Sequence, residues 1–246
     1  MLEKQKMFLW QWLRRHNYDV GVRYYPIAKH IKRLDPRKRW KILDVGSGVM
    51  GIAPFLPGWK VVGIDRKAAE GVPRCIPLLE GSATSLPFSD YSWDAVTCVD
   101  VLEHVSPAER GLVLAELLRV ARKLVVVAFP SGERARDADR RMFDAYAAIG
   151  RCPPQWVSEH LCHPYPDILE LETHVENLRK DTFQMEYWYI FNEHLILQGL
   201  HRYLARVFLP AYKVFTLLCS LALPLLARAP SQQRSYRCIF FILIRC

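Results

Sequence analysis

Residues 40–65 read WKILDVGSGVMGIAPFLPGWKVVGID, and the rest of the chain is arranged around them. A first apolar run carries the acid Asp44 near its end, a glycine turn follows at residues 46–48, and a second apolar run ends on Asp65. This order predicts a strand, a glycine turn, a short helix and a second strand, the βαβ unit of nucleotide-binding folds. A carboxylate that closes the second strand can accept hydrogen bonds from both hydroxyls of a ribose. The stretch therefore predicts a cofactor of the adenosine type.

Composition limits the class of protein. The 246 residues, with 51% hydrophobic and 24% charged side chains, predict one globular α/β domain with extra helices. The net charge of +9 fits either an anionic partner, such as a phosphate or a lipid surface, or a solvated surface, and both interpretations stay open. Seven cysteines without a CxxC pair indicate a reducing compartment, and the first residues mix charges with apolar side chains, unlike a signal peptide. We expect a cytoplasmic protein.

Apolar runs rich in β-branched residues predict the other strands. The run at residues 123–130 is apolar almost throughout, as a central parallel strand should be. Between the fourth and fifth strands, Ser106 followed by Pro107 predicts the start of a helix. The remaining strands are predicted at residues 74–79, 93–99, 183–191 and 236–245.

Helical segments flank this sheet. Residues 1–39 predict an N-terminal helical cap, with helices interrupted around residues 17–21 and again near Pro26. A basic amphipathic helix lying on a membrane surface is the alternative interpretation of this segment. A helical insertion is expected at about residues 131–180, and a long helical stretch at residues 194–227.

The run at residues 214–227 contains no charged side chain. Its 14 residues fall short of the roughly 20 that a membrane span requires, and Pro224 interrupts it. A buried helix or a helix touching a lipid surface therefore fits this segment better than a span.

The glycines of the turn fit two cofactors. Gly46, Gly48 and Gly51 spell GxGxxG, and Asp65 follows Gly46 by 19 residues, as in a dinucleotide site. Asp44 argues against this, because a pyrophosphate is repelled by a carboxylate whereas a ligand with an ammonium group is attracted. The pattern apolar-apolar-acid-apolar-Gly-x-Gly resembles the first motif of class I S-adenosylmethionine-dependent methyltransferases, and S-adenosylmethionine is the cofactor we expect.

The resemblance continues beyond this motif. GSATSLPFSDYSWDAV followed by CVDVLEHV is similar to the third-to-fourth-strand region of the subgroup that includes small-molecule and quinone-type methyltransferases. It extends over residues 41–130, about half of the chain. It implies a Rossmann-like, mostly parallel sheet of seven strands in the order 3-2-1-4-5-7-6, with the last strand antiparallel and helices on both faces, formed by residues 40–246.

The same resemblance implies a cofactor site at the carboxyl edge of the sheet. Asp65 would hold the ribose, Arg66 would flank the adenine, and Ala83 would meet the adenine edge. Ser82 departs from the family pattern, which often has Asp there, so this contact would lose its charge. The residues implied to bind the cofactor are Asp44, Gly46, Ser47, Gly48, Asp65, Arg66, Ser82, Ala83, Val99 and Asp100.

His104 is the candidate catalytic base. It follows the fourth strand, and a neutral imidazole can remove the proton of a hydroxyl nucleophile. The alternative is that Glu103 or His104 only caps the next helix or packs beneath the sheet. A second cluster, His160, Cys162 and His163, matches no standard zinc spacing, so the sequence predicts no metal site.

The sequence thus predicts methyl transfer from S-adenosylmethionine to an O, N or C atom of a small or lipid-linked acceptor. Aromatic and apolar residues in the C-terminal half favour an apolar acceptor, whereas scattered basic residues do not favour nucleic acid. Peripheral contact with the inner face of a membrane is compatible with this function. The alternatives are a noncatalytic S-adenosylmethionine-binding scaffold and a nicotinamide-dependent oxidoreductase. The acceptor and the oligomeric state are left open.

Overall fold

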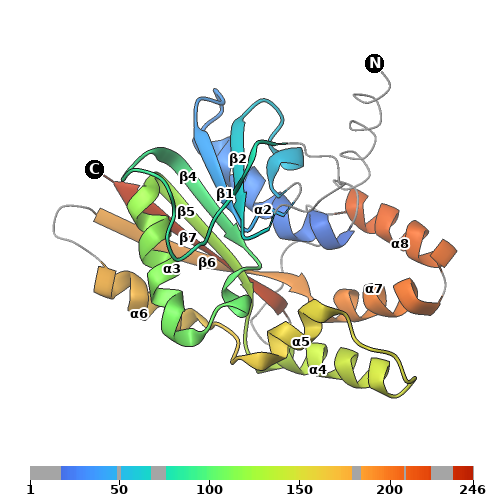
Figure 1. Cartoon of the computed structure of the whole chain (residues 1–246). Helices are drawn as coiled ribbons and strands as arrows, with labels where there is room; N and C mark the ends of the chain where they lie inside the picture. The colour runs from blue at the N-terminus through green and yellow to red at the C-terminus, as the bar shows by residue number, and fades with distance from the viewer. Residues whose placement is uncertain are drawn as a thin grey trace.

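One sheet of seven strands crosses the molecule (Figure 1). The computed structural model describes residues 18–48, 51–67, 76–178, 184–207, 209–222 and 235–245. The strands are β1 (Lys41–Val45), β2 (Lys60–Asp65), β3 (Leu78–Glu80), β4 (Trp93–Val99), β5 (Ala121–Pro130), β6 (Gln184–His194) and β7 (Ser235–Arg245).

The strand order is β3-β2-β1-β4-β5-β7-β6, which confirms the predicted topology. Strands β1 to β5 pair in parallel, and β7 runs antiparallel to both of its neighbours, β5 and β6. Consequently β6 points the same way as β5, and all strands except β7 end at one edge of the sheet. In sheets of this type ligands bind at the carboxyl edge, near the point where the strand order reverses.

The two faces of the sheet are buried by different helices. Alternate residues of β5 face opposite ways, so Val125 and Val127 join one core and Val126 and Ala128 the other. Helices α3 (Pro107–Val120) and α6 (Ile168–Leu178) cover the first face. Helix α2 (Tyr18–Leu34) and the short helix η1 (Ala53–Phe55) cover the second.

The other helices gather beyond the carboxyl edge (Figure 1). A short helix, η2 (Leu102–His104), follows β4. After β5 come α4 (Glu133–Ala147) and α5 (Gln155–Cys162), and after β6 come α7 (Leu195–Val207) and α8 (Leu209–Leu221). Among the described residues, no helix is both long and apolar enough to cross a membrane.

Several predicted boundaries differ from the structure. Helix α2 runs through Pro26 without interruption. Proline has no N–H to donate to the Val22 carbonyl, and the side chain of Asn192 donates to that carbonyl instead. Strand β3 has only three residues, and residues 68–75, where it was expected to begin, lie outside the described part. The division into a cap and a domain with an insertion stays a prediction, and residues 1–17 of the cap are not described.

Candidate functional site

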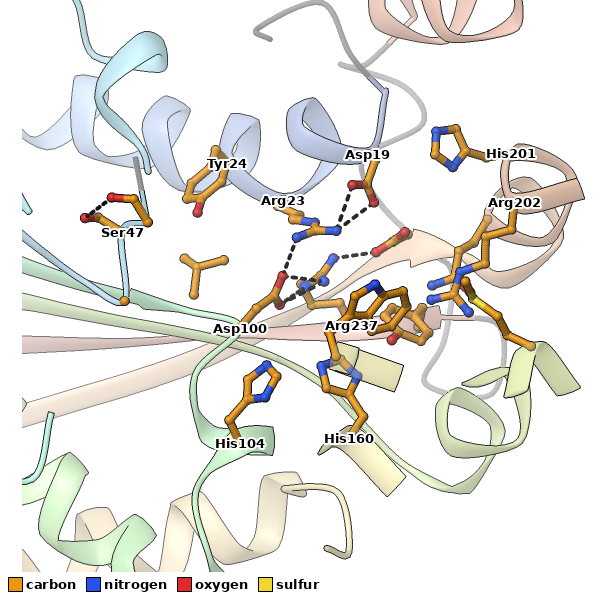
Figure 2. Close-up of a pocket in the computed structure, with 18 of the residues that line it drawn as sticks. Asp19, Arg23, Tyr24, Ser47, Asp100, His104, His160, His201, Arg202 and Arg237 are labelled. Carbon is orange, nitrogen blue, oxygen red and sulfur yellow. Dashed lines mark hydrogen bonds and ion pairs between the residues drawn. The ribbon is translucent and has the colours of Figure 1, made fainter. Parts of the chain in front are cut away.

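Two neighbouring cavities open at the carboxyl edge of the sheet. The first has a volume of about 520 Å³ and the second about 660 Å³. Four residues line both of them and so form their common wall: Gly46, Asp65, Asp100 and His104. Figure 2 shows the first cavity, which lies between α2, the strand ends and the helices that follow β5 and β6.

The glycine turn after β1 shapes this wall. Gly46 has φ +71°, and a Cβ there would lie 2.2 Å from the side chain of Val101, so only glycine fits. The Gly48 N–H donates to the Asp65 carboxylate over 2.8 Å, which ties the turn to the end of β2. The turn and the acid that the sequence singled out are therefore held together, with Ser47 beside them in the first cavity.

Asp44 lies beneath the turn instead of in the cavities. Its side chain accepts hydrogen bonds from Thr97 Oγ1 at 2.6 Å and from the Ile52 N–H at 2.7 Å, and it is 1% exposed. Burial raises its pKa to about 6, and Asp65 adds to the rise. Gly51 lies so close that a Cβ would stand 1.7 Å from a carboxylate oxygen. The structure thus places Asp44 where it supports the turn, and it lines neither cavity.

The second cavity contains the other half of the predicted cofactor site. Arg66 and Ala83 line it together with Val101 and Val105, which supply apolar surface. Ser82 does not line it, since its hydroxyl is engaged with Thr84 Oγ1 at 2.7 Å. Val99 lines the first cavity. All the predicted site residues except Asp44 and Ser82 therefore border one cavity or the other.

Asp100 is held by two arginines that the sequence did not reveal. Its φ is +55°, a strained value for a residue other than glycine, at the turn after β4. Arg237 donates to its carboxylate over 2.9 Å, and Arg23 pairs with the same carboxylate at 2.9 Å (Figure 2). Arg237 also pairs with Glu193, whose φ is +60°. A possible signal was Arg237 itself, one of the few charged residues in an apolar strand.

Aromatic side chains form the outer part of the first cavity. The Arg202 guanidinium stacks between two of them, 5.5 Å from the Trp156 ring and 4.9 Å from the Tyr236 ring. Tyr24 and Tyr146 also line this cavity. The outer part thus combines flat apolar surfaces with cationic groups.

His104 lies on the common wall of the cavities. Its Nδ1 is 3.0 Å from Glu159 Oε2, and 29% of its side chain is exposed. Burial and the neighbouring His160 lower its pKa, so the imidazole is neutral at neutral pH. The orientation and charge of the ring suit a base, although its role in catalysis stays a prediction.

The predicted cluster around His160 is only partly assembled. His160 points inward, with Nδ1 3.0 Å from Asp139 Oδ2, whereas Cys162 is exposed at the end of α5. Asp139 is fully buried and also accepts hydrogen bonds from Tyr236 and Arg202, at 2.7 Å each. These contacts lower the Asp139 pKa to about 2 against the effect of burial. The sequence does not reveal Asp139, because nothing in the charged segment around it marks it as inward-facing.

Known proteins resemble this chain in its central part. Residues 43–129 match the family model described as "Methyltransferase domain". A demethylmenaquinone methyltransferase from Beutenbergia cavernae is 40% identical in an alignment of 136 positions that covers 46% of this chain and 56% of that protein. The chain spans about half the length of the curated relatives it matches.

Solved structures with low sequence identity share the fold. A candidate sarcosine dimethylglycine methyltransferase from Galdieria sulphuraria has a TM-score of 0.55 at 12% identity, over 92% of this chain and 85% of that one. Magnesium protoporphyrin IX methyltransferase from Synechocystis, solved with bound S-adenosylhomocysteine, has a TM-score of 0.50 at 12% identity, over 89% and 80%. These structures share the fold of this chain, and the match over residues 43–129 shows that its central part is similar to a methyltransferase domain.

Proposed function

We propose that this chain transfers the methyl group of S-adenosylmethionine to a small or lipid-linked acceptor. One observation carries the proposal: two cavities of different character meet at a common wall formed by the glycine turn, Asp65, Asp100 and His104. A methyl donor in one cavity and an acceptor reaching in from the other would be brought together at that wall.

The charged side chains of the site can bind the polar groups of S-adenosylmethionine. Asp65 can accept hydrogen bonds from the ribose hydroxyls, with Arg66 and Ala83 beside the adenine in the second cavity. Asp100 lies on the common wall, where its negative charge would favour a ligand with a positive sulfur and an ammonium group. Arg23, which lines the first cavity, can bind the carboxylate of the methionine part.

Methyl transfer requires the protein mainly to align the acceptor atom with the methyl group. A nucleophilic atom of the acceptor forms a bond to the methyl carbon as the bond from carbon to sulfur breaks, leaving S-adenosylhomocysteine. The cavity walls would hold the two reactants in line and exclude water. Where the nucleophile is a hydroxyl, its proton must leave as well, and neutral His104 could accept it.

A flat ring fits the acceptor side of the first cavity. The curated relative named above is a demethylmenaquinone methyltransferase, and in this chain Tyr24, Tyr146, Trp156 and Tyr236 border the space. Aromatic walls favour a planar apolar ring, and Arg202 could bind an oxygen on it. We propose a quinone-type or hydroxylated aromatic ring, carried by an apolar tail, as the acceptor class.

An acceptor with an apolar tail would reside in a lipid layer, so the protein would have to approach it there. Helix α7 lines the first cavity and packs against α8, and the two helices present exposed apolar side chains, among them Ile196, Tyr203 and Leu218. We propose peripheral contact of this α7–α8 surface with a membrane.

Titration calorimetry on the whole chain tests the cofactor. S-Adenosylmethionine and S-adenosylhomocysteine should bind, whereas NADH should not. Asp65→Ala should weaken the affinity by about 1.5–3 kcal/mol, the scale of lost charged hydrogen bonds. Asp90→Ala, which removes an exposed acid that lines neither cavity, is the matched control and should leave the affinity unchanged. Preferential binding of NADH would refute the proposal.

Methyl transfer is then tested with labelled S-adenosylmethionine. Demethylmenaquinone and a total lipid extract serve as acceptors, with Asp65→Ala as the control that has lost cofactor affinity. Label should appear in the lipid fraction with the wild-type chain and fall sharply with the variant. Cofactor binding without label transfer to any fraction of a cell extract would indicate a noncatalytic binding protein instead.

A further inference from the structure

Three side chains with metal-binding atoms meet where η2 contacts α5. Glu103, His104 and His160 each offer one such atom, and these atoms all lie within 4.8 Å of one another. The His104 and His160 rings face each other edge to face, with centroids 4.7 Å apart (Figure 2). In the sequence, His160 is 56 residues away from His104, so no short spacing motif reveals the cluster.

Glu103 has no hydrogen-bond donor among the described residues. It is 1% exposed, and neither carboxylate oxygen has a hydrogen-bond partner. The approach of His160 Nε2, at 3.8 Å from Oε1, is too long for a hydrogen bond. A buried carboxylate without a partner costs several kcal/mol. Such a residue in a folded protein calls for an explanation, and an absent cation supplies one.

Both histidines are oriented by carboxylates on their far sides. His104 Nδ1 is 3.0 Å from Glu159 Oε2, and His160 Nδ1 is 3.0 Å from Asp139 Oδ2. This leaves Nε2 of each ring as the nitrogen available to a further ligand. A carboxylate behind each imidazole is the arrangement that fixes the tautomer and orientation of metal-binding histidines.

We propose that Glu103, His104 and His160 bind one divalent first-row transition cation. Two imidazoles and one carboxylate suit zinc, manganese or iron, and they leave coordination positions open for water or substrate. Metal–ligand bonds of about 2.1 Å place ligand atoms roughly 3–3.5 Å apart, so the three side chains must close by about 1 Å on binding. Of the sequence cluster formed by His160, Cys162 and His163, only His160 takes part.

This step rests on the proposed function: the cation would lie beside the space where the acceptor binds. His104 borders both cavities and His160 borders the first, so the cation would face the acceptor space. An acceptor hydroxyl bound to it would lose its proton more readily and would be fixed in position. His104 would then be a metal ligand and not the base, because Nδ1 faces Glu159 and Nε2 would be occupied.

Direct metal binding tests the proposal without reference to activity. The whole chain, freed of metal with a chelator, is titrated with Zn²⁺, Mn²⁺ and Mg²⁺ by calorimetry. We expect one Zn²⁺ or Mn²⁺ per chain, with Mg²⁺ much weaker because imidazole ligands do not suit it. Glu103→Gln and His160→Ala should each weaken binding by about 100-fold or more, and Glu159→Gln by about 10-fold.

His163→Ala is the matched control, because this histidine directly follows the same helix but lies outside the cluster. It should bind Zn²⁺ as the wild type does. Thermal unfolding separates loss of metal from loss of fold. Without metal, Glu103→Gln should be at least as stable as the wild type, because it neutralises a buried carboxylate, and only the wild type should gain stability on adding Zn²⁺.

The outcomes separate this proposal from the proposed function. Absence of saturable binding by Zn²⁺ and Mn²⁺, or an equal loss of binding in His163→Ala, overturns the metal site. S-Adenosylmethionine affinity, measured with chelator present, reports on the cofactor site independently. Retained cofactor binding without metal binding would leave the methyltransferase proposal intact and restore His104 as the candidate base.

Discussion

At the scale of single residues, Asp44 supports the glycine turn but lowers the free energy of unfolding when it is ionised. Its carboxylate holds the peptide after the glycine turn and is satisfied by two donors, yet burial raises its pKa to about 6. In the folded state Asp44 keeps its proton up to about pH 6, whereas in the unfolded chain it loses that proton near pH 4. Ionisation of Asp44 therefore lowers the free energy of unfolding. A rise from 3.8 to about 6 corresponds to about 3 kcal/mol.

Asp44→Asn should remove this cost. The amide oxygen can accept from the Ile52 N–H, and the amide nitrogen can donate to Thr97 Oγ1, which still reaches the Leu43 carbonyl at 3.4 Å. The wild-type free energy of unfolding, relative to that of the variant, should fall as pH rises from about 4 to about 6 and then stay constant. Urea unfolding across this range measures the difference. A difference that does not change with pH would show that Asp44 titrates normally.

Arg237 is the buried cation on which two acids depend. It is 2% exposed, lies near the start of β7 and pairs with Glu193 and Asp100. Arg237→Met should lower the free energy of unfolding by about 3–5 kcal/mol, because Glu193 is left buried and unpaired. Adding Glu193→Met should recover part of this loss in urea unfolding. A double variant as unstable as the sum of the two single variants would mean that the pair is not coupled.

At the scale of elements, helix α2 depends on a side chain from the far end of the sheet. Pro26 has no N–H to donate to the Val22 carbonyl, and Asn192 Nδ2 donates to it instead over 2.5 Å. Both Val22 and Asn192 are fully buried. This contact joins the N-terminal helix to the end of β6, on the border of the first cavity.

Asn192→Ala should cost about 1–3 kcal/mol, because it leaves the Val22 carbonyl buried without a donor. In a Pro26→Ala background the restored helical N–H can take over, so the same substitution should cost clearly less. Chemical unfolding of the four chains of this double-mutant cycle measures the coupling. Equal costs in both backgrounds would show that Asn192 contributes through packing alone.

The elements differ in how well the sequence predicts them. The apolar run of β5 and the glycine turn after β1 carry local signals, and the strand order that the resemblance implies is confirmed, whereas the roles of the cofactor-site residues stay a prediction. The continuous α2 could not be predicted, because a local rule against proline yields to a tertiary contact with Asn192. Likewise the pairing of Arg237 with Asp100 joins residues 137 positions apart, and no spacing rule foretells it.

At the scale of the whole molecule, the α7–α8 surface exposes several large apolar side chains. Ile196, Leu200 and Tyr203 follow one face of α7, and they are 74%, 42% and 59% exposed. The two helices lie side by side, and α8 adds Leu217 and Leu218 (Figure 1). A surface of this kind on a chain of net charge +9 suits an anionic lipid layer.

The whole chain should therefore float with vesicles of phosphatidylcholine and phosphatidylglycerol and bind less well to phosphatidylcholine alone. Ile196→Glu combined with Leu218→Glu should weaken binding by about tenfold or more, because two apolar side chains no longer leave water and two negative charges meet an anionic surface. Leu112→Glu combined with Leu169→Glu is the matched control, since these residues are 58% and 71% exposed on α3 and α6, which cover one face of the sheet. Equal losses in both variants would mean that charge alone governs the association, and the α7–α8 surface would then have no special part in reaching a lipid-linked acceptor.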